Sequence, residues 1–445
     1  MWSTRSLLHL KQCLRLTRTF LTESYSCTEA WNQRLQSPIL SKIKPRDFFI
    51  EIDSRLQTTG KLGAIDVDIY ANTVNHIDSV DETINVLHRF RMTANTSDTF
   101  DSTHHAIIRY LLDCNDTETL LHILDDRLNY GIFPDHLCYN LMMDKFIKAQ
   151  DYVSAAKVAT FLMLQEDNDH PICNALAVYS CYKFLENPDA WVLPPPEPEI
   201  PDDEKTKIRV FYLRNPFFDD HFDLREPKHL VGKTLVFFGK YYKDTPLGRT
   251  CMLRGFILHE KYDEAVKLID HWIQNSTKEV IFKDTLPLIN KELDAIPEEK
   301  INDNVKVLQE KIKELEKCSL KDGSIMEEIE MKIKEAVETR TAKDIEHQLS
   351  IYKQWDEKRM AVLTAQLKEL DKEKRLAQIK EIKEDLAKRE RLLTFYENEE
   401  KLELQIEKKL KWEEEVYGPP VEQATILDED YIPPDVTSKP AIQNK

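Results

Sequence analysis

Apolar and polar residues follow one another along much of the chain with the spacing of amphipathic helices. From residue 136 to residue 167, apolar positions recur three or four residues apart, stop at a short polar break over 149–151, and then resume. Two helical stretches joined by so short a break predict a hairpin of two antiparallel helices.

This hairpin pattern repeats with a period of 35 residues. Shifted back by one period, its apolar and acidic positions fall on Ile107, Leu111 and Asp116. A second shift finds a weaker copy near Asp81, and a forward shift finds another first helix from Pro171. A hairpin cannot bury its apolar face alone, so successive copies predict a stacked array.

A further copy lies downstream, beyond an insertion. When the later segment is shifted back by 110 residues, Tyr262 falls on Tyr152 and Ala265 falls on Ala155. We interpret the pair as packing, because the small residue lets two helices approach and the aromatic ring fills the gap at the turn. The competing interpretation is that any amphipathic hairpin gives such an overlay.

The last third of the chain changes character. From residue 324 to residue 417 there is no Gly and no Pro, which predicts one helix about 140 Å long at about 1.5 Å per residue. Apolar residues form short heptad-like runs, such as Leu363, Leu367 and Leu370, and lose register near Lys374. Since a sustained coiled coil needs three or four unbroken heptads, we favour a solvated single helix that is partly packed on neighbours.

Two other segments lack the helical pattern of the array. The first 22 residues carry four basic residues, no acid and a stripe of leucines, which is typical of a mitochondrial presequence; a frayed basic terminus is the alternative. Six of the twenty prolines lie between residues 188 and 201, among acidic residues, and predict an extended linker.

The sequence therefore predicts an all-α fold, in which a short right-handed array of helical hairpins is followed by a long charged helix. The predicted organisation is a presequence over 1–27, helical repeats over 28–187, a Pro-rich acidic linker over 188–229, further hairpins over 230–322, a long charged helix with partial coiled-coil character over 323–417, and a disordered tail over 418–445.

Composition excludes several classes of function. Only nine of 445 residues are glycine, which argues against a nucleotide-binding α/β enzyme. Val231-Gly232-Lys233-Thr234 looks like the end of a phosphate loop, but Pro227 occupies the first required glycine position. The eight cysteines lack zinc spacing and no catalytic motif is found, so we expect no enzyme, cofactor or metal. No run of 18 apolar residues exists, so we expect no membrane span.

The residues from 130 to 156 support a resemblance to a known family. Tyr130-Gly131-Ile132-Phe133-Pro134-Asp135, the following Tyr139-Asn140-Leu141-Met142-Met143-Asp144, and Ala155-Ala156 resemble a pentatricopeptide repeat. More narrowly, this stretch is similar to the central repeats of one family of mitochondrial small-subunit ribosomal proteins. The resemblance implies a 35-residue repeat array of the pentatricopeptide type.

In pentatricopeptide proteins, the first helices line a surface that holds single-stranded RNA, and the fifth and last residues of each repeat choose the base. Counted from His136, the implied RNA-binding candidates are Tyr70, His105, Asp135 and Asn140. No repeat carries a complete base-reading pair of the usual types. With a net charge of −17, the chain is not a general polyanion binder, so we expect local contacts to RNA shape and phosphate, or packing on proteins.

The resemblance implies a structural, RNA-contacting component of the small ribosomal subunit in the mitochondrial matrix. Its implied partners are small-subunit ribosomal RNA and neighbouring ribosomal proteins, with tRNA or mRNA as further candidates, and no membrane or small-molecule substrate. The main alternative is an RNA processing or stability factor of the same repeat type outside the ribosome. A repeat–nuclease fusion would need clustered metal-binding acids after Lys228, and a cytoskeletal coiled coil would need sustained heptads; neither feature is seen.

Overall fold

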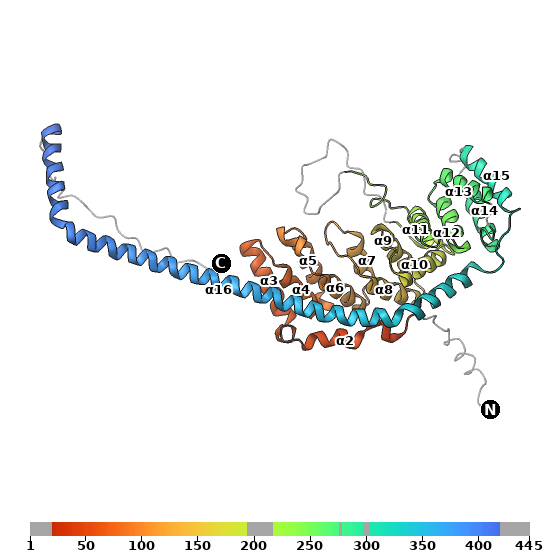
Figure 1. Cartoon of the computed structure of the whole chain (residues 1–445), viewed down its shortest axis with the longest axis horizontal. Helices are drawn as coiled ribbons and strands as arrows, with labels where there is room; N and C mark the ends of the chain where they lie inside the picture. Colours follow the sequence, from red (N-terminus) through yellow and green to blue (C-terminus); the bar gives the residue numbers. More distant parts are fainter. Residues whose placement is uncertain (1–19, 194–216, 276–277, 297–302, 419–445) are drawn as a thin grey trace, which may run out of the picture. The chain divides into compact units, whose positions relative to one another are not determined.

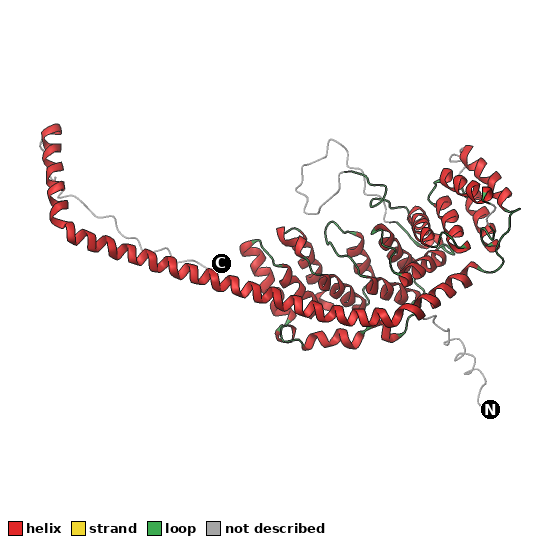
Figure 2. Ribbon diagram, viewed as in Figure 1, coloured by secondary structure: helices red, strands yellow, loops and turns green. Residues whose placement is uncertain are grey.

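The computed structural model describes residues 20–193, 217–275, 278–296 and 303–418. All regular elements within these residues are helices, as Figure 2 shows, which confirms the predicted fold class. The chain divides into two units after Leu363, and each is described by itself. No helix of the described residues is long and apolar enough to cross a membrane.

The first unit is a series of helical hairpins preceded by an N-terminal segment of short helices (Figure 1). The N-terminal segment comprises η1 (Glu23–Ser26), α2 (Thr28–Gln33), η2 (Arg34–Gln36) and η3 (Leu40–Lys42). The array comprises α3 (Pro45–Thr59), α4 (Ala64–Thr73), α5 (Val80–Arg91), α6 (Asp101–Cys114), α7 (Thr117–Asp125), α8 (His136–Lys148), α9 (Tyr152–Leu164), α10 (Pro171–Phe184), α11 (Pro227–Tyr241), α12 (Pro246–Leu258), α13 (Tyr262–Gln274), α14 (Leu286–Asp294) and α15 (Asp303–Leu315). The 3-10 turns η4 (Ile77–Ser79), η5 (Ala94–Asp98), η6 (Pro188–Ala190) and η8 (Lys283–Thr285) connect them.

The helix starts follow the period found in the sequence. Helices α6, α8 and α10 begin at residues 101, 136 and 171, each 35 residues after the one before. Acidic residues fix three of the starts: the side chains of Asp116, Asp135 and Asp151 accept hydrogen bonds from backbone amides in the first turns of α7, α8 and α9. Such caps satisfy amides that have no partner within the helix.

The downstream copy of the hairpin is real. Tyr152 begins α9 and Tyr262 begins α13, and Ala155 and Ala265 are both fully buried. Burial of both alanines is what the packing interpretation expects, and the close approach of the helices stays a prediction.

Scarce glycines are concentrated where α11 crosses α12. A Cβ atom on Gly255 would lie 2.6 Å from the carbonyl oxygen of Gly232, and one on Gly248 would lie 2.1 Å from the carbonyl oxygen of Tyr242. Both distances are far inside van der Waals contact. The segment 231–234, which looks like part of a phosphate loop, thus lies within α11 and serves helix packing.

The predicted presequence over 1–27 reaches into the described residues. Within 20–27, Leu21, Tyr25 and Cys27 are buried, and Leu21 and Tyr25 belong to the same core as the repeats. The following residues to 42 form short helices rather than a hairpin, and Trp31 and Leu40 are buried in the same core as the array. The presequence prediction for residues 1–19 lies outside the described residues.

Helix α16 (Ile325–Tyr417) is the predicted long charged helix. Up to Leu363 it belongs to the first unit, where Ile325, Ile329 and Ile333 are buried. From Thr364 onward its apolar residues, including Leu367 at 62% and Ile382 at 58%, are exposed. The predicted linker ends three residues earlier than expected, because α11 starts at Pro227; its residues 194–216 and the tail over 419–445 lie outside the described residues.

Candidate functional site

The first helices of the hairpins carry the four residues predicted to contact RNA. The structure places Tyr70 on α4, His105 on α6 and Asn140 on α8, and leaves at most 1% of each exposed. Asp135 precedes α8, and 37% of its side chain is exposed. Their contact with RNA stays a prediction, and each has partners within the chain.

Asn140 and His105 bond to segments that lie far away in the sequence. The amide nitrogen of Asn140 donates a 2.7 Å hydrogen bond to the Tyr25 hydroxyl of the N-terminal segment. His105 Nε2 lies 3.1 Å from the Tyr352 hydroxyl of α16. Tyr70 instead turns toward α5, where its hydroxyl lies 3.5 Å from Thr83 Oγ1. The structure therefore brings together His105 and Asp135, and places Tyr70 and Asn140 with other partners.

Arg109 and Asp144, each one helical turn after His105 and Asn140, bind the N-terminal segment. Both terminal nitrogens of Arg109 donate 2.7 Å hydrogen bonds to the carbonyl oxygen of Ser26. One repeat later, Asp144 Oδ1 accepts from the backbone amides of Phe20 and Leu21 at 3.3 Å. Two polar groups one repeat period apart thus bind the backbone of the N-terminal segment between Phe20 and Ser26.

Helix α16 is fastened to the same face by a buried ion pair. Arg359 Nε donates a 2.7 Å hydrogen bond to Asp68 Oδ2, with 3% and 0% of the two side chains exposed. The other carboxylate oxygen of Asp68 accepts hydrogen bonds from Asn72, Ser102 and Thr103. A buried charge is tolerated when its hydrogen bonds are made, as they are here.

A second polar contact to α16 lies at the level of α10. Asp344 accepts hydrogen bonds from the Tyr25 hydroxyl at 3.3 Å and from His170 Nε2 at 2.9 Å. Burial raises the pKa of Tyr25, as does the charge of Asp344, so the phenol stays protonated and can donate. Asp344 therefore links α16, the N-terminal segment and the array.

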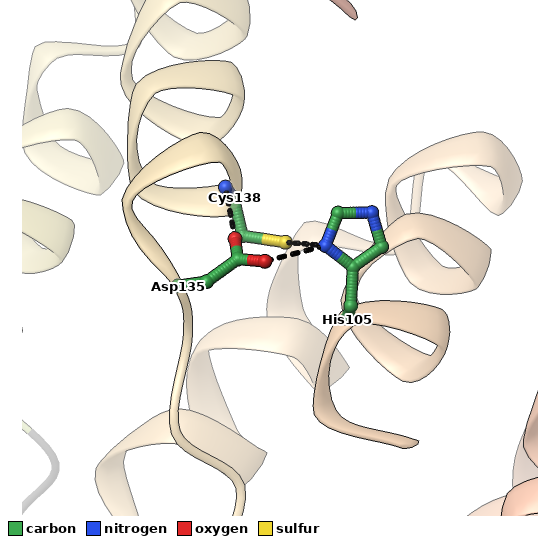
Figure 3. Close-up of side chains that lie close together, drawn as sticks. All are labelled: His105, Asp135 and Cys138. Carbon is green, nitrogen blue, oxygen red and sulfur yellow. Dashed lines mark hydrogen bonds and ion pairs between the residues drawn. The ribbon is translucent and has the colours of Figure 1, made fainter. Parts of the chain in front are cut away.

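Among the described residues, His105, Asp135 and Cys138 form a cluster of three potential metal ligands whose donor atoms lie within 4.8 Å of one another (Figure 3). His105 Nδ1 lies 2.7 Å from Asp135 Oδ2 and 3.3 Å from Cys138 Sγ, while the backbone amide of Cys138 donates to Asp135 Oδ1 at 2.7 Å. Burial alone would raise the pKa of Asp135, but the charge and hydrogen bond of His105 hold it below its usual range. Burial and the neighbouring Asp135 raise the pKa of the Cys138 thiol well above its ordinary value.

The donor set of this cluster does not fit a structural zinc site. Such sites use four ligands, and cysteine ligates as the thiolate, whereas this group has three donors within the described residues and a protonated thiol. The cluster is explained by its hydrogen bonds: Asp135 caps α8 and at the same time orients His105 toward Tyr352.

The most important residues of this face were missed in the sequence. Tyr25, Asp68 and Arg359 give no local signal, because one lies in the predicted presequence and the other two resemble solvated helix residues. The one available signal was aromatic: Tyr352 and Trp355 interrupt a helix that is otherwise rich in charge, and both pack on His105.

Comparison with models of known families identifies a relationship. The model of the family described as mitochondrial 28S ribosomal protein S27 matches residues 1–385. The matched range includes the N-terminal segment, the hairpin array and the part of α16 that packs on it. The chain therefore belongs to the mitochondrial 28S ribosomal protein S27 family.

Proposed function

We propose that this mitochondrial small-subunit ribosomal protein acts as a non-enzymatic scaffold of the subunit in the matrix and supports translation there. The observation that carries the proposal is the filled inner face of the array. Buried side chains of α4, α6 and α8 bind the N-terminal segment and α16 rather than lining an open groove. A rigid body of this kind suits an architectural role, because little conformational entropy is lost when it binds.

The partners that we propose are small-subunit ribosomal RNA and neighbouring ribosomal proteins, with tRNA or mRNA as further RNA candidates. The net charge of −17 favours local RNA contacts over a broad electrostatic one. The repeats are proposed to be of the pentatricopeptide type, on the basis of the 35-residue spacing of α6, α8 and α10. Reading of bases by His105 or Asn140 would require α16 or the N-terminal segment to move, so we propose that RNA contacts occur outside this face.

The solvated part of α16 supplies the second half of the proposal. Beyond Leu363 its exposed apolar residues alternate with charges of both signs, as in helices that pack against partners only locally. We propose that this segment acts as a strut between the array and neighbouring subunit components.

Sedimentation of detergent-lysed mitochondria on a sucrose gradient tests the proposal. The protein is expected to run with small-subunit RNA, and to stay there when the lysate is treated with an unrelated RNA competitor. A protein that stays at the top of the gradient would refute the scaffold role. A position in lighter particles that hold processed transcripts would favour the alternative, a pentatricopeptide-type factor outside the ribosome.

A further inference from the structure

A cavity of about 500 Å³ lies where the N-terminal segment, α4 and α16 meet. Its walls come from residues 30–38, from Asn72 and from residues 349–359 of α16. The volume lies within the range of small-ligand sites, and three segments distant in the sequence converge on it.

The lining of this cavity has a net positive charge, whereas the whole chain has a net negative charge. Its lining contains three basic residues and one acidic residue, in a protein whose net charge is −17. The acid, Asp356, is already paired with Arg359 at 2.5 Å. Among the described residues, neither Arg34 nor Lys353 has a carboxylate within salt-bridge distance, so two basic residues of the lining make no direct ion pair, although the charge of Asp113 acts on Arg34.

Arg34 is held in place before any ligand arrives. Its guanidinium lies 3.7 Å from the centre of the Trp31 ring, and its Nη1 donates to the carbonyl oxygen of Trp31 at 2.9 Å. Its Nε is buried without a hydrogen-bond partner. Burial, and then the charge of Arg109, lower the pKa of Arg34 to about 10, while the charge of Asp113 opposes that shift.

Aromatic rings form the remaining wall. Tyr352 and Trp355 of α16 are partly buried, with ring centres 5.5 Å apart, and both line the cavity. Partly exposed aromatic rings beside a fixed guanidinium are the combination that proteins use for single-stranded nucleic acid, in which the rings stack on a base and the arginine bonds to phosphate.

We propose that this cavity binds one unpaired nucleotide of single-stranded RNA, with its phosphate on Arg34 and Lys353 and its base against Trp355. The proposal rests on the proposed function only for the choice of RNA. It differs from base reading along the repeats, because the groups come from the N-terminal segment and α16. An acidic peptide is the competing occupant, but its carboxylates would bind the basic residues and would not account for the aromatic rings of Tyr352 and Trp355.

The experiment measures binding of a fluorescent single-stranded oligouridylate to the full chain by anisotropy, over a series of salt concentrations. Arg34→Gln is expected to weaken binding about tenfold, because it removes a charge-assisted hydrogen bond. Lys353→Gln is expected to weaken it less and to lower the slope of log affinity against log salt by about 0.7. Trp355→Phe should retain most of the affinity, whereas Trp355→Leu should lose about tenfold.

Lys343→Gln is the matched control, since Lys343 is an exposed residue of the same helix that does not line the cavity. It is expected to leave affinity unchanged, and circular dichroism melts establish that each variant folds. If Arg34→Gln fails to fold, the exposed Lys353→Gln and the charge-retaining Arg34→Lys carry the test.

Two results would overturn the proposal. One is equal binding by wild type, Arg34→Gln and Lys353→Gln; the other is displacement of the RNA by polyglutamate at equal charge concentration, which identifies an acidic-peptide site. Neither result touches the scaffold role, which is decided by sedimentation with the small subunit. Conversely, loss of sedimentation with intact oligouridylate binding would refute the scaffold and leave the nucleotide site standing.

Discussion

Removal of the buried arginine of α16 is the sharpest test of how this helix is held on the array. Arg359→Met keeps the length of the side chain and much of its apolar stem but removes the charge. Asp68 then keeps its hydrogen bonds from Asn72, Ser102 and Thr103 and loses its countercharge. With 0% of the Asp68 side chain exposed, water cannot replace the guanidinium without opening the structure.

The expected cost follows from this geometry. Breaking a buried ion pair on one side costs about 3–5 kcal/mol, because an uncompensated charge is left behind. The double variant Asp68→Asn/Arg359→Met has no buried charge and should cost less than Arg359→Met alone, giving a coupling energy of about 1–3 kcal/mol. Lys343→Met, on the exposed side of the same helix, should change stability by less than about 0.5 kcal/mol.

Hydrogen exchange of peptides from the α16 segment before Leu363 is the appropriate assay. A chain of two units need not unfold in one step, so local opening free energies are more informative than a single melting temperature. Arg359→Met should accelerate exchange in this segment and leave α13–α15 unchanged. Exchange within about 0.5 kcal/mol of wild type would refute the argument that the ion pair fastens α16.

Three further predictions concern the array. Ala155→Glu places a charge in a fully buried helix seam and should abolish the cooperative melt, whereas Ala155→Ser should still fold; an unchanged melt would contradict the repeat register. Gly255→Ala should lower the free energy of unfolding by about 1–3 kcal/mol in urea titrations, because the new Cβ would meet the Gly232 carbonyl oxygen. Gly60→Ala is the comparison variant: it has open space around it, so it introduces the backbone strain of a positive φ without a steric clash. Burial, and then the charge of Lys261, lower the pKa of His259 in the folded chain to about 4. Because the unfolded chain binds a proton at the ordinary pKa of 6.5, the stability contributed by His259 is present above pH 6.5 and is lost as pH falls toward 4. His259→Gln should flatten that acid-side loss in melts recorded from about pH 7.5 to about pH 4.5, and an unchanged pH profile would contradict the assignment.

Local features of this molecule could be predicted from the sequence because their causes are local. The hairpins follow from apolar spacing, and the period of 35 residues places the starts of α6, α8 and α10. The length of α16 follows from a stretch without Gly or Pro. Even the packing role of Ala155 follows from its comparison with Ala265.

Long-range pairing could not be predicted, because no local pattern encodes it. Asp68 and Arg359 lie 291 residues apart, and each looks like a solvated residue of an amphipathic helix until the other is brought against it. The same holds for Tyr25, which lies in the predicted presequence over 1–27. Its hydroxyl accepts a hydrogen bond from Asn140, 115 residues away. The periodicity of apolar residues identifies which face of a helix is covered. It does not identify which part of the chain covers that face.

The part of α16 before Leu363 lacks a continuous heptad seam because it packs on the array. A two-stranded coiled coil presents the same seam along its length, whereas a helix laid across an array meets successive repeats with different side chains. Tyr352 meets His105, Asp344 meets His170, and Arg359 meets Asp68, each on a different repeat. Of the candidate RNA-binding residues, His105 is thereby used to seat this helix, whereas Asn140 bonds to the N-terminal segment. His105 and Asn140 each have a tyrosine hydroxyl of a distant segment as their partner, Tyr352 in α16 and Tyr25 in the N-terminal segment.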